Sequence, residues 1–439
     1  MRTLVSGRSS LFAGLFAAAI LCGAGAATAQ PTKPIKVGQV PSPGRPPAVL
    51  KVFREPPKAA RPPGVRFVPA PQRIIINRQA LAAAIESGYL KRFTAEFLKR
   101  CTPKAVGCAI AAVGPHGMWS EGAAGDARRA PDSSPRKLTA TDKITMASVS
   151  KVFTGTALQK LLDEKGISVD RKIGPYLLKH WKRSSAVDNM TFRQLLTHTS
   201  GLKCDGITYD QLKSCLASAQ PSPSPWEYRN ENFALMRILI PQINGMSAAT
   251  LKPMVDADLA GNSGWISASH AILYRQYVNK TVFAPAGLPL MHCKPTDALP
   301  ALSYKSATAN KWDFSKVGPG DPWGDMSESC GSQGWFLSAH QMAQTMSAIM
   351  TPGKVLPAPV LESMKKDNLA IYFGDNGDGL QSWNHGGYHP AEWNKGEINT
   401  LIIHFNNGVS AGVIINSPYG AGSAGNYFED LIAAIKAAG

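Results

Sequence analysis

The chain has 439 residues, of which 44% are hydrophobic and 18% are charged, and its formal net charge is +17. This length and composition are those of a folded protein with a large core. The charge does not indicate a nucleic-acid partner. Arg2, Arg8 and residues 31–73 supply +10 of it, and no basic helix with interleaved aromatic residues occurs in the remainder.

The first residues have the features of an export signal. Arg2 and Arg8 precede an apolar run over 11–21, and Ala27-Thr28-Ala29 is typical of a signal-peptidase site. The apolar run is too short to form a permanent membrane-spanning helix. We therefore interpret residues 1–29 as a cleavable signal peptide and expect a periplasmic or secreted protein without stable membrane insertion.

A basic, proline-rich segment follows the signal. Residues 31–73 contain twelve of the 33 prolines, nine Lys or Arg and one acidic residue. Such a composition buries too little apolar surface to offset the entropy lost on ordering. The sequence therefore predicts that residues 30–76 form a disordered, extended linker. Its expected role is a spacer or a salt-sensitive anchor to an anionic envelope polymer.

The composition becomes globular from residue 77 to residue 439. Hydrophobic periodicity predicts a helix over 80–100, strands over 106–113 and 118–122, and an all-helical middle region. Near the end, Asn407-Gly408 lies between the strand-like runs 400–406 and 409–416, which is a strong hairpin signal, and a helix is predicted over 424–437. This order predicts an α+β fold in which helices flank an antiparallel sheet beside an all-helical lobe.

The cysteines indicate an oxidising compartment. One of the seven, Cys22, lies in the predicted signal, and the remaining six are an even set. Their scattered spacing does not fit a metal site. Proximity along the chain favours the pairs Cys101–Cys108 and Cys204–Cys215, which leaves Cys293 and Cys330.

The motif with the clearest chemical meaning is Ser148 followed by Lys151. Residues at i and i+3 share one helix face, so the hydroxyl and the amine are expected side by side. The apolar run that follows predicts a buried helix, and burial lowers the pKa of a lysine so that it can act as a base. A second such pair, Ser363 and Lys366, lies in a lysine-rich stretch without partner motifs, and we interpret it as surface.

Further motifs follow in a fixed order. Tyr228-Arg-Asn230 precedes an apolar helix, and His385-Gly-Gly387 lies in a strand-like segment. The segment 194–202, Gln-Leu-Leu-Thr-His-Thr-Ser-Gly-Leu, lies between the Ser148–Lys151 pair and the Tyr228 motif. Its His198 is expected to organise a turn. Another Tyr-x-Asn, Tyr277-Val-Asn279, ends an amphipathic stretch, and we set it aside.

These four elements in this order resemble the serine β-lactamase and penicillin-binding superfamily, from about Phe93 to the end of the chain. The branch they resemble holds class C β-lactamases, D-alanyl-D-alanine carboxypeptidases, D-aminopeptidases and related esterases. The resemblance implies a β-lactamase-like fold over 77–439, with the active site in the cleft between the sheet and the helical lobe.

The resemblance also implies roles for single residues. Ser148 would be the nucleophile, and Lys151 and Tyr228 would share the proton transfers, with the identity of the base left open. Asn230 and His385 would bind substrate, and the backbone N–H groups of Ser148 and Tyr388 would form the oxyanion hole. Gly387 would leave room for the acyl chain. The segment 331–338 is expected to be structural, and 247–270 is a candidate roof of the cleft.

The sequence departs from the resembled pattern at His385-Gly386, where many β-lactamases have lysine and a hydroxyl residue. Histidine supplies a cation only below about pH 6.5, which weakens the interpretation as an efficient β-lactamase. We expect an exported serine hydrolase without metal or cofactor. It would be a peptidase or esterase that acts on cell-wall-type D-amino-acid peptides or on small esters. The first substrate class would place the protein near peptidoglycan. The alternatives are a β-lactamase and, from another class, a non-catalytic penicillin-binding sensor.

Overall fold

The computed structural model describes residues 50–52, 74–76, 78–204, 206–306, 316–391, 396–420 and 426–439. The predicted signal peptide, 1–29, lies outside them. Within the predicted linker, β1 (Leu50–Val52) pairs antiparallel with β2 (Ile74–Ile76). The rest of the predicted linker, 30–49 and 53–73, lies outside the described residues, and the β-branched residues of the two strands favour pairing. No described helix is long and apolar enough to cross a membrane.

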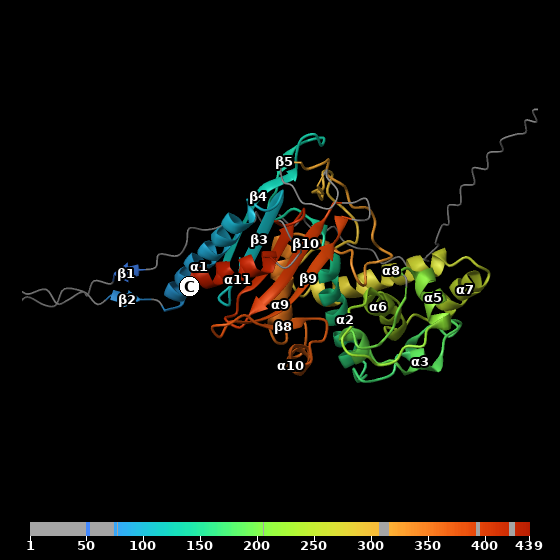
Figure 1. Cartoon of the computed structure of the whole chain (residues 1–439). Helices are drawn as coiled ribbons and strands as arrows, with labels where there is room; N and C mark the ends of the chain where they lie inside the picture. Colours follow the sequence, from blue (N-terminus) through green and yellow to red (C-terminus); the bar gives the residue numbers. More distant parts are fainter. Residues whose placement is uncertain are drawn as a thin grey trace, which may run out of the picture. The chain divides into compact units, whose positions relative to one another are not determined.

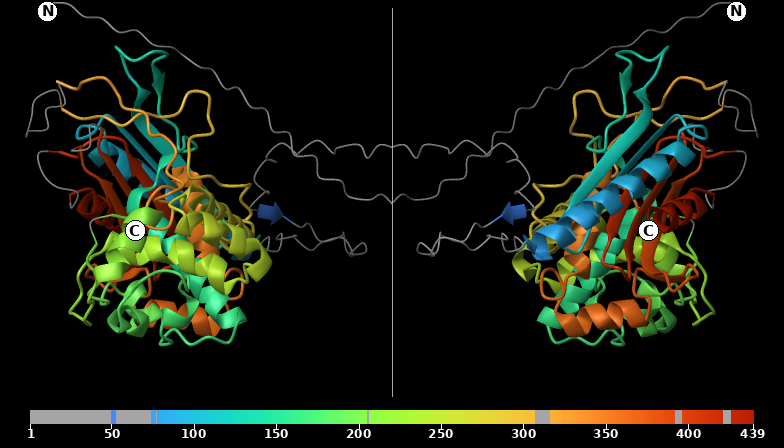
Figure 2. Two further views of the ribbon diagram at one scale, coloured as in Figure 1. Left: turned by 90° about the vertical axis from the view of Figure 1, so that its right-hand side faces the viewer. Right: turned by 90° about the vertical axis from the view of Figure 1, so that its left-hand side faces the viewer.

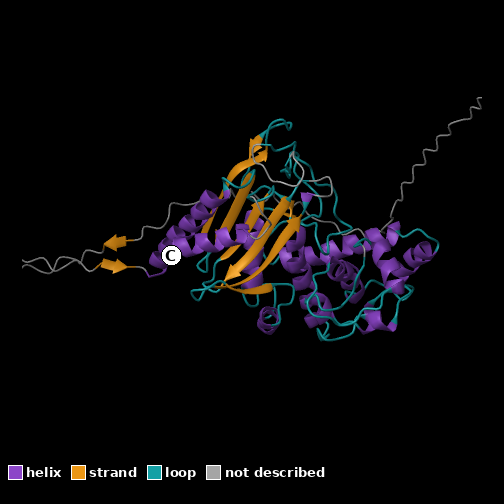
Figure 3. Cartoon of the chain, viewed as in Figure 1, coloured by secondary structure: helices purple, strands orange, loops and turns teal. Residues whose placement is uncertain are grey.

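A seven-stranded antiparallel sheet is the centre of the fold (Figures 1 and 3), and its strand order is β5-β4-β3-β11-β10-β9-β8. These strands are β3 (Gly107–Val113), β4 (Trp119–Arg128), β5 (Arg136–Lys137), β8 (Tyr372–Asp375), β9 (Gln381–His389), β10 (Ile398–Phe405) and β11 (Ser410–Ile415). A separate pair joins β6 (Ile144–Thr145) to β7 (Phe336–Leu337). The Asn407-Gly408 turn connects β10 to β11, as its sequence predicts.

The helices divide between the two faces of the sheet and a helical lobe. They are α1 (Arg78–Cys101), α2 (Ser150–Glu164), α3 (Ser185–Asn189), α4 (Phe192–Leu196), α5 (Tyr209–Ser218), α6 (Asn230–Ile243), α7 (Ala248–Leu259), α8 (Gly264–Val278), α9 (Ala339–Met350), α10 (Ala358–Lys366) and α11 (Asn426–Ala438). The lobe comprises α3 to α8, and α2 connects it to the sheet, because α2 packs on both α6 and α8.

The alternation of side chains along β3 shows how the two faces are covered. Ile110 points into a cluster with Phe93 of α1 and Leu431 of α11, whereas Ala111 belongs to the larger cluster that contains Met342 of α9. Figure 2 shows α1 lying across its face of the sheet. Helices α1 and α11 thus cover one face and α9 covers the other, as expected for a strand buried on both sides.

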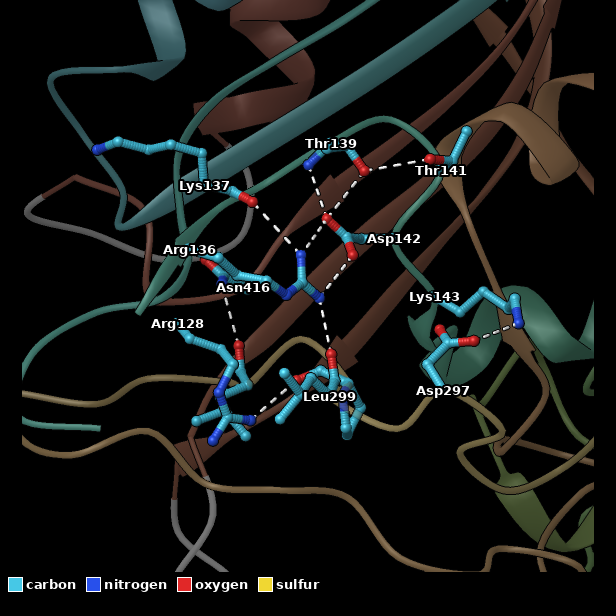
Figure 4. A network of polar contacts seen from close by, with 12 residues as sticks. Arg128, Arg136, Lys137, Thr139, Thr141, Asp142, Lys143, Asp297, Leu299 and Asn416 are labelled. Atoms are coloured by element: carbon cyan, nitrogen blue, oxygen red, sulfur yellow. Dashed lines mark hydrogen bonds and ion pairs between the residues drawn. The ribbon is translucent and has the colours of Figure 1, made fainter. Parts of the chain in front are cut away.

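A polar network ties the β4–β5 end of the sheet to the loop near residue 299 (Figure 4). Arg136 pairs with Asp142 at 2.7 Å and donates to the Leu299 carbonyl at 2.9 Å. Arg128 donates to the Pro300 carbonyl at 3.1 Å. These bonds fix a long irregular connection whose backbone carbonyls would otherwise lack partners.

Three disulfides link the six cysteines outside the predicted signal. They are Cys101–Cys108, Cys204–Cys215 and Cys293–Cys330. This is the pairing that proximity along the chain favours. The first bridge joins the end of α1 to β3, and the third joins two loops around the β6–β7 pair.

Candidate active site

The residue at the centre of the site, Ser148, lies on η1, a short 3-10 turn (Ala147–Val149) that leads directly into α2. Ala147 has φ of 46°, a left-handed conformation that costs a residue with a side chain about 1–3 kcal/mol. The Met146 N–H donates to the Trp335 carbonyl at 2.7 Å, and the Thr400 hydroxyl donates to the Met146 carbonyl at 2.7 Å. These bonds hold the strained turn in place, so the Ser148 hydroxyl has a defined position.

Lys151 is the second residue of α2 and is fully buried. Its Nζ lies 3.0 Å from Ser148 Oγ, and it donates to Asn230 Oδ1 at 2.7 Å and to the Ser332 carbonyl at 2.8 Å. Burial lowers the pKa of Lys151 well below its usual value, and the Glu231 carboxylate only partly opposes this. A neutral amine has two N–H groups and one lone pair. With two N–H groups directed at Asn230 Oδ1 and the Ser332 carbonyl, a neutral Lys151 would have its lone pair available for the Ser148 hydroxyl.

Tyr228 is positioned by the residues around the start of α6. Its hydroxyl donates to Ser148 Oγ at 2.6 Å. The His198 ring stacks on the Tyr228 ring with 4.6 Å between centroids, and His198 Nδ1 accepts from the Arg229 N–H at 3.0 Å. His198 itself has φ of 56°. It thus organises the turn, as the sequence predicts, and it also orients the tyrosine.

The protonation state of Tyr228 differs from the sequence-based expectation. A neighbouring ammonium is expected to lower the pKa of the phenol, but burial raises the pKa of Tyr228 above its usual value, with a smaller opposing effect from the bond to Ser148. Burial of the phenol is the main cause, and the neighbouring Tyr372 adds to the rise. Tyr228 is therefore a protonated donor toward Ser148 Oγ.

Strand β9 forms the opposite wall of the site. A Cβ on Gly387 would lie 2.4 Å from the Met146 carbonyl oxygen and 2.2 Å from Thr400 Oγ1, so glycine is needed for β9 to approach the turn that carries Ser148. The sequence instead predicts that Gly387 leaves room for the acyl chain. Tyr388, half-exposed, hydrogen-bonds through its side chain to Glu397.

His385 is not the cation that the sequence predicts near pH 6.5. Its side chain is buried, and burial lowers the pKa of His385 to about 3, with a smaller effect from Lys151. The imidazole is therefore neutral at neutral and mildly acidic pH. Its Nδ1 lies 2.6 Å from the Gly386 carbonyl oxygen. A pKa this low argues against the expected strengthening of anion binding below about pH 6.5.

A cavity of about 440 Å³ lies between these walls. Five of the predicted site residues line it: Ser148, Tyr228, Asn230, His385 and Tyr388. The other two, Lys151 and Gly387, lie behind the lining, against Ser148 and the Met146 carbonyl respectively. The rest of the lining consists of Trp226, Gln333, Tyr372, Gly386 and Pro390.

Sequence reasoning missed several of these residues. The segment 331–338 is interpreted from the sequence as structural, but its Ser332 carbonyl holds Lys151 and its Gln333 side chain lines the cavity. The role of the Ser332 carbonyl could not be predicted, because every residue has a backbone carbonyl. Trp226 could have been predicted, because it lies two residues before Tyr228. Tyr372 lies on β8 and reaches the site only because β8 pairs with β9.

Other candidate residues lie away from the cavity. Tyr277 donates to Glu164, and Ser363 bonds to Asp367, so both are correctly set aside. The stretch 247–270 contributes no residue to the lining, because its Asp258 is buried in the helical lobe, where it bonds to His180, Tyr209 and Lys213. Its prediction as a roof of the cleft is wrong. Trp393, which is close to His385 in the sequence, lies outside the described residues.

Comparisons with known proteins agree with the fold and with the order of the motifs. The Beta-lactamase family model matches residues 90–433, so the chain belongs to this family. Among solved structures, it is similar to the D-amino acid amidase from Ochrobactrum anthropi SV3 complexed with D-phenylalanine, at 17% identity and TM-score 0.58, covering 80% of this chain and 99% of that one. It is also similar to a D-stereospecific amidohydrolase from Streptomyces sp., at 18% identity and TM-score 0.54, covering 76% and 97%.

A third similar structure is a penicillin binding protein from Bacillus halodurans, at 16% identity and TM-score 0.53, covering 79% of this chain and 98% of that one. At these identities the likeness establishes the shared fold, a seven-stranded antiparallel sheet with a helical lobe. The family and its structural neighbours are serine hydrolases and penicillin-binding proteins. The substrate of this chain has to be argued from its own cavity.

Proposed function

We propose that the protein is a serine hydrolase that acts through an acyl-Ser148 intermediate on amides or peptides of D-amino acids. One observation carries the proposal: Lys151 Nζ and the Tyr228 hydroxyl lie 3.0 Å and 2.6 Å from the same Ser148 Oγ. Both distances are within hydrogen-bond reach of a nucleophile and its proton-transfer partners. The similarity to D-amino acid amidase and D-stereospecific amidohydrolase structures supports the substrate class.

In the proposed acylation step, Ser148 Oγ attacks the substrate carbonyl carbon, and the hydroxyl proton passes to the lone pair of Lys151. Lys151 is the base because burial lowers its pKa while burial raises that of Tyr228. The backbone N–H groups of Ser148 and Tyr388 stabilise the oxyanion, each contributing about 3 kcal/mol to the transition state. The proton then moves through Tyr228 to the leaving nitrogen as the C–N bond breaks.

Water completes the cycle. It attacks the acyl-Ser148 ester, Lys151 accepts its proton, and Ser148 regains a hydrogen as the C–O bond breaks and the acid leaves. Asn230, which accepts from Lys151 through its Oδ1, keeps the amine aligned in both steps and has its NH₂ group available for a substrate carbonyl. The sequence features of export and the three disulfides support a periplasmic or secreted location, where peptides of the cell wall are substrates.

Intact-protein mass spectrometry tests the nucleophile. Full-length protein is incubated with a fluorophosphonate or a β-lactam, and Ser148→Ala is treated in parallel. We expect a fluorophosphonate adduct on the wild type that is absent from the variant, whose melting temperature stays close to that of the wild type. An adduct that persists in Ser148→Ala would refute the assignment of the nucleophile. A β-lactam adduct that never decays, combined with no hydrolysis of any D-amino acid amide, would favour a penicillin-binding protein without turnover.

A further inference from the structure

The imidazole of His385 has one nitrogen that the protein itself does not use. Nδ1 lies 2.6 Å from the Gly386 carbonyl oxygen, and because a carbonyl only accepts, Nδ1 carries the ring hydrogen. Nε2 therefore holds a lone pair. This atom is buried and has no hydrogen-bond partner among the described residues. The His385 side chain is 2% exposed, and the residue lines the cavity. A buried acceptor without a partner is costly unless a ligand supplies a donor.

The rest of the lining offers no partner for an anion. Among the described residues that line the cavity, none is Asp, Glu, Lys or Arg. Lys151, the cation nearest to Ser148, has its Nζ within 3.0 Å of three protein oxygens, those of Ser148, Asn230 and Ser332. A carboxylate in this cavity would lose its hydration without gaining a cation, which is strongly unfavourable.

The same surroundings suit an amine and an apolar side chain. The Tyr372 ring lies 5.0 Å from the His385 ring, and Trp226 contacts Tyr372 at 6.3 Å between centroids while it stays 59% exposed. Aromatic faces attract ammonium groups and pack against apolar groups. An N–H donor thus finds an acceptor in His385 and aromatic faces beside it.

We propose that His385 determines specificity: its Nε2 accepts a hydrogen bond from an amine or amide N–H of the substrate, so the cavity selects amino acid amides with apolar side chains and rejects substrates that place a carboxylate there. This inference rests on the proposed function and narrows it. The cavity would favour neutral or amine-bearing amides over substrates that are recognised through a carboxylate. Such carboxylate substrates include β-lactams and peptides that are cut next to their C-terminal carboxylate.

Steady-state kinetics with matched substrates test the inference. The set is D-phenylalanine amide, 3-phenylpropionamide, which lacks the amine, N-succinyl-D-phenylalanine amide, which adds a carboxylate on the acyl side, and D-phenylalanyl-D-alanine, which adds one on the leaving side. A hydrogen bond to a charged donor contributes about 1.5–3 kcal/mol, so we expect kcat/KM for D-phenylalanine amide to exceed each of the others by about tenfold or more. Equal kcat/KM values across the set would overturn the inference without any variant.

Variants of His385 separate specificity from structure. His385→Gln keeps an acceptor and should retain the preference for the amine, whereas His385→Leu should lose it, mainly through a higher KM. His385→Lys supplies a cation and should raise the ratio of kcat/KM for the two carboxylate substrates to that for the amide by about tenfold. His404→Gln is the matched control: His404 is a partly buried histidine of the same sheet, outside the cavity lining, and its Nδ1 lies 2.8 Å from Ser410 Oγ. In His404→Gln, the ratio of kcat/KM for the carboxylate substrates to that for the amide should equal the wild-type ratio.

The result also distinguishes this inference from the proposed function. Fluorophosphonate labelling of Ser148 is measured on every variant. Two outcomes in labelled protein would overturn the role of His385 and leave the hydrolase assignment intact. One is an unchanged carboxylate-to-amide ratio of kcat/KM in His385→Lys, and the other is a preference for the amine-bearing amide that persists in His385→Leu. No labelling of the wild type would overturn both.

Discussion

The two walls of the cavity differ in how completely the protein pairs their polar atoms. On the helical wall, Lys151 contacts three protein oxygens and the Tyr228 hydroxyl donates to Ser148 Oγ. On the strand wall, His385 Nε2 has no partner among the described residues. The reactive groups are thus held in position before substrate arrives, which is what electrostatic preorganisation requires. A group that recognises substrate instead keeps an open position for it.

The largest expected effect comes from breaking the helical wall at Lys151. Lys151→Met removes the amine at similar side-chain length, and kcat/KM for D-phenylalanine amide should fall by about 10³-fold or more, within the range of general-base catalysis. Lys160→Met is the control, because Lys160 lies on the same helix, is partly exposed and pairs with Glu164 outside the cavity. A folded Lys151→Met protein with activity within about tenfold of the wild type would show that another group is the base.

A smaller effect on the same wall is expected at Tyr228. Tyr228→Phe keeps the ring that stacks on His198 but removes the hydroxyl that donates to Ser148 Oγ, so kcat should fall by about 10²-fold with little change in KM. Tyr277→Phe, which loses a hydroxyl bonded to Glu164 far along α8, should keep wild-type rates. If both variants behaved alike, the Tyr228 hydroxyl would have no part in proton transfer.

The strand wall is expected to make the fold sensitive to acid. Burial lowers the pKa values of His385 and His389, both on β9, to about 3. Below about pH 6.5 an unfolded histidine binds a proton that the folded one does not. The stabilisation is therefore present above pH 6.5 and is lost as the pH falls from there toward 3. We expect the melting temperature to drop by several degrees between pH 7 and pH 5, as measured by calorimetry.

His389→Asn should make that drop smaller, because one of the buried neutral rings is removed, whereas exposed His116→Asn should leave it unchanged. A melting temperature independent of pH over this range would contradict the burial of these rings in their neutral form. The difference between His389→Asn and the wild type isolates the contribution of β9, because burial also lowers the pKa of His198, beside Tyr228, to about 3 and that ring contributes to the total drop.

Local patterns were enough to predict much of the fold. The periodicity of 80–100, the apolar run 106–113 and the Asn407-Gly408 turn each specify an element through nearby residues alone, and these appear as α1, β3 and the β10–β11 hairpin. The contact between Ser148 and Lys151 also follows from helix geometry, because the two are three residues apart.

The rest depended on tertiary contacts. The neutral state of His385 and the raised pKa of Tyr228 come from burial, which the motif letters do not encode. The Ser332 carbonyl that holds Lys151 is a backbone atom 181 residues away. The place of the stretch 247–270 also depends on tertiary contacts, because Asp258 bonds to His180 and Tyr209 inside the helical lobe.

The pairing of α1 with α11 has a practical consequence. Arg92 of α1 donates to the Ala438 carbonyl at 2.8 Å, and Tyr89 donates to the Ile435 carbonyl at 3.3 Å, so the last helix is fastened beside the first on the sheet face opposite α9. A resin, a fusion partner or a surface attached at the C-terminus would therefore lie next to the sheet face that α1 and α11 cover. No described residue that lines the cavity belongs to α1 or α11, so such an attachment would not contact the lining directly.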